Sequence, residues 1–259
     1  MEASGSQHRV ERPRQSGLVA FFDILGYQNF VLNNDVEQGV LPILQALATM
    51  PTSLRSEYLN GAPEAITAIL DDTEHLVFSD TILLTCPVKA DLSEADQLTR
   101  WFVFTLQAGL LQRKMFHFGF PIRGAITFGN FVREKSCFAG RAIIEAYQLV
   151  GELDAAAVVF SPQAGALLSK LVQTQSSGDG ALLARLAVEY LVPTKTLPPQ
   201  RRWTVDFTRF GNAGFPSLEG DARALVAECF WKHNKDLPQS AYAKLTNTEL
   251  LLRYLRTTP

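Results

Sequence analysis

Two aspartates close short apolar runs in the first third of the chain, and their positions suit metal chemistry. Asp23 comes near the end of the run 17–24, GLVAFFDI, and Asp80 lies between two apolar stretches within 74–85, EHLVFSDTILLT. A partly buried, ionised carboxylate is costly unless a cation or hydrogen-bond donors compensate it. Each residue also has an ordinary explanation, because Asp23 could cap a helix that begins near Leu25 and Asp80 could be a common turn acid.

Taken together, the two aspartates point to a divalent-metal site. On neighbouring strands Asp23 and Asp80 would come close enough to repel, and such a pair needs a raised pKa or a bound cation. Hard carboxylate oxygens suit magnesium or manganese, and paired ions support in-line displacement at phosphorus. Arg123, in the strand-like run 121–131, PIRGAITFGNF, could direct its planar guanidinium at phosphate oxygens. Considered without the two aspartates, Arg123 would more simply be explained as an arginine that forms an ion pair with a surface acid.

The elements that must position these residues alternate irregularly along the chain. Short apolar runs predict strands, and longer stretches with apolar residues every three or four positions predict helices. The expected strands are 17–24, a hairpin over 74–85, 121–131, 155–160 and 202–207, and the expected helices are 35–50, 93–116, 139–150, 161–171, 218–234 and 240–255. With a surface loop at 173–180, this order predicts an α+β or mixed α/β sandwich, not a doubly wound parallel sheet.

Length and composition set limits on the kind of protein. The chain has 259 residues, 47% of them hydrophobic and 19% charged, which suits one large globular domain. Because no long linker divides the chain, we expect a polar, disordered tail over 1–16 and a single domain over 17–259 with a C-terminal helical extension. The net charge of −2 creates no positive field for nucleic acid or an anionic membrane.

Cysteine usage and hydropathy indicate the compartment. The three cysteines, Cys86, Cys137 and Cys229, are widely spaced and fit neither a zinc site nor a secreted disulfide scaffold. The longest apolar runs are too short to cross a bilayer. We therefore expect a cytoplasmic protein.

Three motifs, in order and in register, resemble those of the class III nucleotidyl cyclases. The segment 22–27, FDILGY, looks like the family's opening F-D-I-x-G-F, and Ser79-Asp80 stands where the family has Gly-Asp on a β-hairpin. The segment 123–129, RGAITFG, is similar to the later strand R-x-G-I-x-x-G. The resemblance spans roughly the first half of the chain and continues more weakly over 140–149. It implies a ferredoxin-like or palm-type fold, with an antiparallel-containing sheet and packed helices, that works as a homodimer with sites at the interface.

The resemblance also implies a role for each matched residue. Asp23 and Asp80 would bridge two divalent ions, Mn²⁺ or Mg²⁺, with the carbonyl of Ile24 as a further metal ligand. Arg123 would contact the triphosphate. The phosphates would be held by the backbone of three consecutive residues, Leu25, Gly26 and Tyr27. The ribose 3′-hydroxyl would attack the α-phosphorus, and pyrophosphate would leave.

Four positions depart from the family's pattern, all in the parts that read a purine or stabilise the transition state. Leu76 stands where adenylate cyclases have a lysine for adenine, and Cys137 stands where they have the adenine-reading aspartate. Ile144 and Gln148 replace the stabilising asparagine and arginine. Arg141 could stabilise the transition state in place of the missing arginine, although the ordinary explanation is that Arg141 is a solvent-exposed surface residue.

The departures favour a base other than a purine. The stand-alone domain, the opening AFFDILGY, the strand RGAIT and the helix GRAIIEAY are similar to short bacterial pyrimidine cyclases of anti-phage signalling. Those enzymes make cyclic UMP or cyclic CMP for a separate effector with a cyclic-nucleotide sensor. We therefore predict a cyclase for UTP, or else for CTP. Three aromatic residues could narrow the base pocket, although such residues are more often core: Tyr27, Phe138 and Tyr147.

Two other functions compete with this prediction. A cyclase-like module that has lost catalysis could bind a nucleotide or only dimerise, because the stabilising pair is missing. A different palm-like phosphoryl-transfer enzyme, such as a dinucleotide synthase, is the other candidate, and the missing G-G-[DE]-E-F weighs against its diguanylate version. Retention of both Asp23 and Asp80 beside Arg123 favours an active enzyme, since loss of catalysis leaves metal ligands free to drift.

Overall fold

One mixed sheet organises the part of the chain that the computed structural model describes, residues 15–134, 137–174, 178–210 and 214–258. Its eight strands run in the order β2-β3-β1-β4-β6-β8-β7, with β5 paired to β4. The strands are β1 (Gln15–Ile24), β2 (Glu74–Phe78), β3 (Thr81–Pro87), β4 (Ile122–Glu134), β5 (Cys137–Ala139), β6 (Val158–Phe160), β7 (Ala187–Val192) and β8 (Gln200–Val205). β4 and β6 are parallel and the other described strand pairs are antiparallel, which confirms the α+β class.

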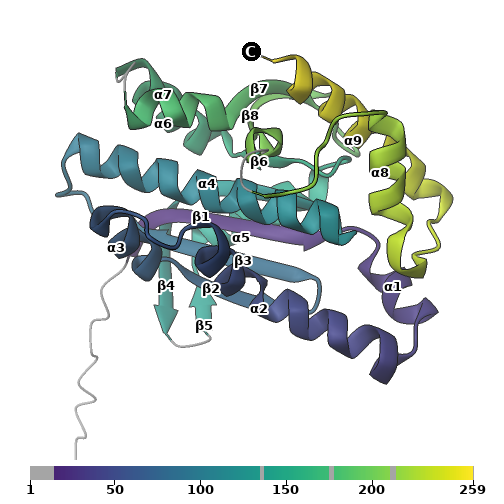
Figure 1. Cartoon of the computed structure of the whole chain (residues 1–259). Helices are drawn as coiled ribbons and strands as arrows, with labels where there is room; N and C mark the ends of the chain where they lie inside the picture. The colour runs from purple at the N-terminus through teal and green to yellow at the C-terminus, as the bar shows by residue number, and fades with distance from the viewer. Residues whose placement is uncertain (1–14, 135–136, 175–177, 211–213, 259) are drawn as a thin grey trace, which may run out of the picture.

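Helices cover both faces of this sheet (Figure 1). They are α1 (Tyr27–Asn33), α2 (Leu41–Tyr58), α3 (Glu64–Asp72), α4 (Glu94–Phe118), α5 (Arg141–Glu152), α6 (Pro162–Thr174), α7 (Asp179–Leu186), α8 (Ala222–Trp231) and α9 (Gln239–Thr257), with the short turns η1 (Val36–Val40), η2 (Phe207–Phe210) and η3 (Lys232–Asn234). Leu18 and Phe22 of β1 belong to the core that contains residues of α4. Val19 and Phe21, on the other face of the same strand, belong to the core of α5, α8 and α9.

Burial on both faces explains why β1 is a continuous apolar run and not an alternating one. Leu18, Val19, Ala20 and Phe22 are all buried. Gly124, the partner of Phe22 on β4, is needed for this packing, because a Cβ there would lie 2.5 Å from the Phe22 ring. Its role is to admit an aromatic ring into the core.

The long helix α4, which matches the helix expected over 93–116, is capped at both ends. Ser93 Oγ accepts a hydrogen bond of 3.1 Å from the Asp96 N–H, which satisfies one of the free donors of the first turn. The helix ends at Gly119, whose φ of 89° reverses the chain into β4. α4 therefore delivers the chain directly to the strand that carries Arg123.

Several elements differ from the sequence-based expectations. Helices α3 and α7 and strand β7 were not predicted, and the loop expected over 173–180 contains the end of α6 and the beginning of α7. Gly178 is the N-cap residue of α7, and residues 175–177 of the expected loop lie outside the described residues. β1 begins at Gln15, two residues before the expected strand, and the rest of the expected tail lies outside the described residues.

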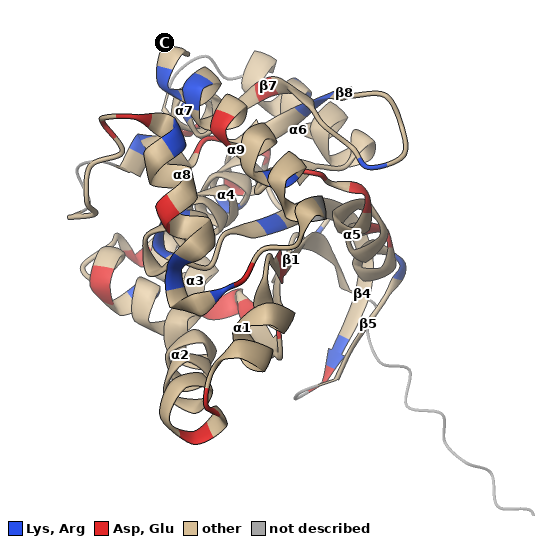
Figure 2. Ribbon diagram, turned by 90° about the vertical axis from the view of Figure 1, so that its right-hand side faces the viewer, with Lys and Arg blue, Asp and Glu red and all other residues tan. Residues whose placement is uncertain are grey.

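Charged residues of both signs are spread over the fold, and acidic and basic residues are interspersed around the described elements (Figure 2). In the described part of the chain, no helix is both long enough and apolar enough to pass through a lipid bilayer.

Candidate active site

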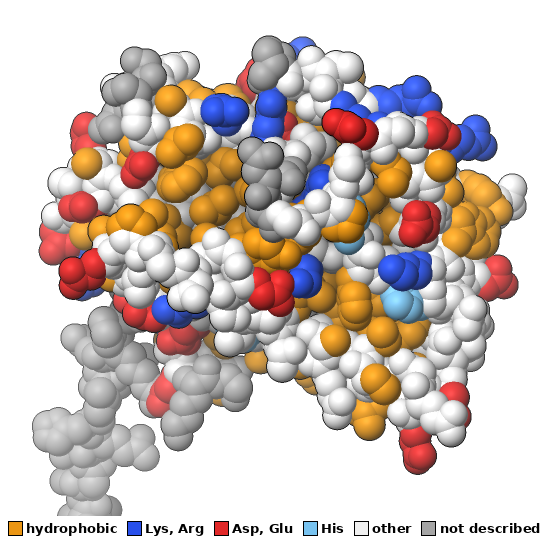
Figure 3. Space-filling model, viewed as in Figure 1, with side chains coloured by type: hydrophobic (Ala, Val, Ile, Leu, Met, Phe, Trp, Pro, Cys, Tyr) orange, Lys and Arg blue, Asp and Glu red, His pale blue; other side chains and the backbone are white. Residues whose placement is uncertain are grey.

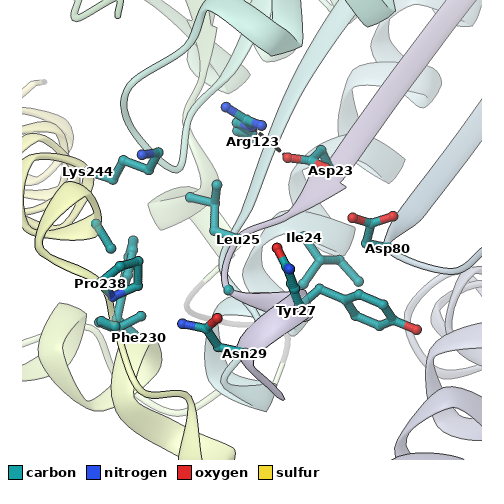
Figure 4. Close-up of a pocket in the computed structure, with 14 residues that line it drawn as sticks. Asp23, Ile24, Leu25, Tyr27, Asn29, Asp80, Arg123, Phe230, Pro238 and Lys244 are labelled. Atoms are coloured by element: carbon teal, nitrogen blue, oxygen red, sulfur yellow. Dashed lines mark hydrogen bonds and ion pairs between the residues drawn. The ribbon is translucent and has the colours of Figure 1, made fainter. Parts of the chain in front are cut away.

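Strand register brings together the three residues that the sequence singled out. Asp23 on β1 is paired with Arg123 on β4 and, on its other side, with Thr81 on β3. Asp80 precedes Thr81 in the β2–β3 turn, and its carbonyl accepts a 2.9 Å hydrogen bond from the Ile24 N–H. The turn is therefore fastened to the end of β1, and Figure 4 shows both carboxylates at the same end of one cleft.

Arg123 is ion-paired with the first of these acids. Its Nε donates to Asp23 Oδ2 at 2.6 Å, and its Nη1 donates to the Leu153 carbonyl at 3.2 Å. Both side chains are largely buried. Arg123 is therefore not paired with a surface acid, as its ordinary explanation would have it. Its partner is the candidate metal ligand Asp23, inside the cleft.

The environment of Asp23 disfavours its negative charge. Burial raises the pKa of Asp23 above its ordinary value, and the Asp80 carboxylate adds to that rise. Arg123 opposes the rise through its charge and its hydrogen bond, but burial has the larger effect on the pKa. A carboxylate in this situation gains from further positive charge, which a divalent ion would supply.

The turn after β1 has a backbone conformation that requires glycine. Gly26 has a φ of 80°, and a Cβ there would lie 3.2 Å from the Lys235 side chain. The Leu25 N–H is bonded to the Pro121 carbonyl at 2.9 Å, so this amide is not available to a phosphate. Of the three predicted phosphate-binding amides, those of Gly26 and Tyr27 remain, at the start of the two-turn helix α1.

A cleft of about 280 Å³ joins these residues to the C-terminal part of the chain. One end is polar, with Asp23, Asp80 and Arg123, and the middle is the turn 24–29. The other end comes from α8, α9 and the segment between them. Its lining residues are Phe230, Leu237, Pro238, Ala241 and Lys244. In Figure 4 the Lys244 side chain extends from α9 toward the Arg123 side of the cleft.

Asparagines of α1 and its C-cap hold the C-terminal segment in place. Asn29 and Asn33 donate side-chain hydrogen bonds to the carbonyls of Asp236 and Asn234, the second at 3.1 Å. Asn34 donates to the His233 carbonyl at 2.9 Å. The loop that follows the first metal-ligand candidate is thus tied to residues about 200 positions later in the chain.

Lys235 lies beneath this junction without a carboxylate partner among the described residues. It is 1% exposed, and its Nζ donates to the carbonyls of Gly119 and Cys229, the latter at 3.1 Å. The Phe120 ring lies 4.8 Å from the Nζ. Burial lowers the pKa of Lys235 to about 8. Its aliphatic stem supports Gly26, so Lys235 joins the end of α4 to the turn of the cleft.

The donor set of the cleft fits a hard divalent ion. The described residues contain no group of three or more His, Cys, Asp or Glu side chains placed to hold a metal, so protein ligands would be the two carboxylates and the Ile24 carbonyl. Magnesium and manganese accept such a set, because they retain water and substrate phosphate oxygens as further ligands. The chemistry of these oxygens therefore matches the predicted cofactor.

Residues at the positions that depart from the family's pattern lie outside the cleft. Leu76 is half-buried in β2, Cys137 is exposed on β5, and Ile144 and Gln148 are exposed on α5. None of them lines the cleft with Asp23. Of the three aromatics expected at the base, Tyr27 lines the cleft. Phe138 and Tyr147 do not, and Tyr147 packs edge-on against Phe21 with ring centres 5.5 Å apart.

Comparisons with known proteins gave structural neighbours only. No family model matches the chain, and no curated protein matches it. The adenylyl cyclase CyaB from P. aeruginosa is similar in structure, with a TM-score of 0.45 and 13% identity over 74% of this chain and 94% of that one. A bacterial light-regulated adenylyl cyclase has a TM-score of 0.47 and 11% identity over 76% and 92% of the two chains.

A third neighbour is the catalytic core of a rhodopsin-guanylyl cyclase with converted specificity, solved with ATPαS. Its TM-score is 0.46, with 12% identity over 74% of this chain and 95% of that one. Because these scores are low, the assignment of the site rests on the geometry of this chain's own residues.

Proposed function

We propose that this protein is a metal-dependent pyrimidine nucleotide cyclase, which converts UTP, or else CTP, to the 3′,5′-cyclic nucleotide and pyrophosphate. The observation that carries the proposal is the cleft in which Asp23, Asp80 and Arg123 meet. Two carboxylates and an arginine beside a glycine turn are what a metal-bound triphosphate needs. Their agreement with the motifs of class III cyclases supports cyclisation over other phosphoryl transfers.

In the proposed reaction, a bond forms between the ribose 3′-oxygen and the α-phosphorus. The bond from the α-phosphorus to its bridging oxygen breaks, pyrophosphate leaves and the hydroxyl proton passes to water. Asp23, Asp80 and the Ile24 carbonyl would hold divalent ions, which, when bound, lower the pKa of the hydroxyl and balance the charge of pyrophosphate. Arg123 would bind phosphate oxygens, after exchanging part of its pair with Asp23 for the ligand.

Lys244 is a further candidate contact for the triphosphate. It lines the same cleft as Arg123 from the opposite wall, and its Nζ is ion-paired with Asp154 Oδ1 at 3.6 Å. Burial lowers the pKa of Lys195, and the nearby charges of Arg123 and Lys244 lower it further, so Lys195 is a third cation close to these two. Such a cluster matches the charge of a triphosphate better than that of a monophosphate.

The apolar wall supports a small base. Phe230, Leu237 and Pro238 line the cleft, and no residue there reproduces the purine-reading pair of the family. A pyrimidine would pack its ring against such a surface and leave hydrogen bonds to a few polar groups. We favour UTP over CTP and extend the proposal to the biological setting: a cytoplasmic second-messenger enzyme of anti-phage defence, whose product acts on a separate effector.

A homodimer is part of the proposal. In the strand register, Phe78 is paired with Thr81, and Thr81 is paired with Asp23. Because paired residues point to the same face of a sheet, the Phe78 side chain lies on the same face as Asp23, where it is 75% exposed. Ile144 and Tyr147 of α5 are 58% and 62% exposed. A second copy of the chain would bury these apolar residues next to the cleft and bring its own residues to the nucleotide.

The proposal is tested by offering the purified chain each of the four ribonucleoside triphosphates with Mn²⁺ or Mg²⁺ and identifying products by mass spectrometry. We expect a cyclic mononucleotide and pyrophosphate from UTP, or from CTP. Binding of triphosphates without any product would instead identify a catalytically silent nucleotide-binding module. A dinucleotide product would identify the palm-like synthase.

A further inference from the structure

A second polar cavity lies apart from the cleft, next to the segment 214–219, which crosses in front of α4 in Figure 1 and so belongs to the face that Figure 3 shows. Its volume is about 510 Å³, and its walls come from α4, η2, the segment 214–219 and the end of α9. The lining residues are Arg113, Thr208, Phe215, Ser217, Leu218, Glu219 and Arg256. Two of the seven are arginines, and none of the seven lines the cleft that contains Asp23.

Arg113 is a buried cation whose hydrogen bonds are incomplete. It is 1% exposed, and its Nη2 donates to the Pro216 carbonyl at 2.7 Å. Its Nε and Nη1 are buried and have no hydrogen-bond partner among the described residues. The guanidinium carbon lies 5.9 Å from the centre of the Phe215 ring, which covers it. A guanidinium in this position is costly unless an anion compensates its charge and its free N–H groups.

Arg256 brings a second incomplete guanidinium to the same cavity. Its Nη1 donates to the Gly220 carbonyl at 2.9 Å, while Nε and Nη2 are buried without a partner in the described part of the chain. The two arginines that line this cavity therefore have four N–H-bearing atoms without a hydrogen-bond partner among the described residues. Like charges that approach each other in a protein interior require a counter-charge between them.

The nearby acids compensate these charges only in part. Asp206 is fully buried and already bound, through hydrogen bonds from Arg209 Nε at 2.9 Å and from the Thr208 hydroxyl at 2.5 Å. Asp221 and Glu219 are exposed and act on Arg256 through their charges, but no ion pair among the described residues joins either acid to Arg113 or Arg256. The cavity therefore contains more cationic than anionic groups.

The titration behaviour agrees with this charge balance. Burial lowers the pKa of Arg113 to about 10, and the neighbouring charge of Arg256 lowers it further, against a smaller opposite effect of Asp206. Burial and the charges of Arg113 and Lys232 lower the pKa of His117 to about 4, so this ring is neutral at pH 7 and adds no charge.

We propose that this cavity is a second anion site, which binds a phosphate group, free or carried by a small molecule. A phosphate group has several oxygens in a tetrahedral arrangement, so it can accept hydrogen bonds from two guanidinium groups at once. A carboxylate has only two oxygens and typically pairs with a single guanidinium. Ser217 supplies a hydroxyl group at the wall, whereas the Thr208 hydroxyl donates a hydrogen bond to Asp206. The site is independent of the proposed cyclase activity, because it shares no residue with that cleft.

The test measures the full chain with inorganic phosphate and pyrophosphate as probes, in EDTA, with acetate and chloride at matched ionic strength. Calorimetric titration gives the affinity, and thermal unfolding gives the rise in Tm that a ligand of the folded state must cause. The variant Arg123→Gln removes phosphate binding by the cleft. We expect this variant to keep a phosphate-specific Tm rise that acetate and chloride do not produce.

Two substitutions locate the binding. Arg256→Gln, close to the surface, should weaken phosphate binding by about tenfold or more. The charge-matched control Arg223→Gln, an exposed arginine of α8, should change the affinity by less than about twofold. Arg113→Met should also remove the phosphate response. In phosphate-free buffer its Tm should equal or exceed that of the wild type, because it replaces an uncompensated buried charge with an apolar side chain.

The outcomes decide the proposal. A wild-type Tm that responds to phosphate no more than to chloride overturns it, as does unchanged phosphate affinity in Arg256→Gln. A lower Tm of Arg113→Met in phosphate-free buffer, together with no phosphate response in the wild type, would show that Arg113 only anchors the Pro216 carbonyl. If Arg113→Met does not fold, the comparison of Arg256→Gln with Arg223→Gln decides alone.

Discussion

The two ends of the candidate cleft are built in different ways. The polar end comes from neighbouring strands, where register alone places Asp23 beside Arg123 and next to the turn that carries Asp80. The apolar end comes from α8, α9 and their connection, which reach the cleft through side-chain hydrogen bonds to α1. Under the proposed function, the groups for chemistry would therefore lie on the sheet, and the part that selects the substrate would lie on a later, separately anchored segment.

The largest expected effect tests the sheet end. Asp80→Asn keeps the size of the side chain but removes a charged metal ligand, so we expect turnover of the preferred triphosphate to fall on the order of a thousandfold. Product formation by mass spectrometry and circular dichroism for the fold are the measurements. Asp91→Asn, an exposed turn acid, is the matched control. Turnover within tenfold of the wild type in Asp80→Asn would remove Asp80 from the metal site.

The junction between the two ends is tested through Lys235. The folded protein loses the Lys235 proton at about pH 8 and the unfolded chain near the ordinary pKa of 10.5, so unfolding takes up a proton between these values. The free energy of unfolding should therefore rise with pH across this window, by on the order of 3 kcal/mol. Denaturant titrations of the wild type and Lys235→Met at several pH values isolate this contribution, since other titrating groups cancel in the difference.

A difference between wild type and Lys235→Met that does not change with pH would contradict the burial of a charged Lys235. The same variant, Lys235→Met, also tests whether the junction between the two ends of the cleft affects substrate binding. If Lys235 supports the Gly26 turn, Lys235→Met should raise KM for the triphosphate, whereas a purely local role in α8 would leave KM unchanged.

Arg123 is the next test of the sheet end. Arg123→Gln removes a charge-assisted contact to the triphosphate, and we expect KM to rise by about ten- to a hundredfold. Steady-state kinetics over a range of triphosphate concentrations give KM and kcat separately. Arg141→Gln, at the exposed start of α5, should leave both unchanged. A selective fall of kcat in Arg141→Gln would instead make Arg141 the substitute for the family's stabilising arginine.

The smallest effect is expected at the C-terminal end. Lys244→Gln should raise KM for the triphosphate by about three- to tenfold and leave kcat unchanged, because a partly exposed lysine contributes binding and not chemistry. The affinity for the nucleoside monophosphate should change less than the affinity for the triphosphate. Lys170→Gln, an exposed lysine of α6, is the control. Equal losses for monophosphate and triphosphate would place Lys244 near the base and not near the outer phosphates.

The same division explains how much the sequence predicts. Asp23, Asp80 and Arg123 were predictable because each ends or begins a short apolar strand, and antiparallel pairing converts such positions into neighbours. The occupied N–H of Leu25 was not predictable, since its partner, Pro121, is about 100 residues away. Lys235, Lys244 and Arg113 carried no local signal at all, because their environments depend on how α4, α8 and α9 pack.

The missed elements have the same cause. α7 and β7 follow a Ser/Gly-rich stretch whose composition is typical of a loop, and β7 is defined by its pairing with β8. The role of Gly124, which leaves room for the Phe22 ring, likewise depends on a neighbouring strand. Patterns that repeat within one element were reliable, and features defined by contacts between distant elements were not.

The asparagine bonds between α1 and residues 233–236 have a consequence for protein synthesis. As the ribosome extends the chain, the strands that carry Asp23, Asp80 and Arg123 emerge first and can pair before the residues of α8 and α9 exist. During that interval a nascent chain holds the carboxylates but has no wall for a nucleotide base. Under the proposed function, the capacity to bind substrate would therefore arise late in translation, when residues near 244 have left the exit tunnel, and a prematurely terminated product would have the acids without the pocket.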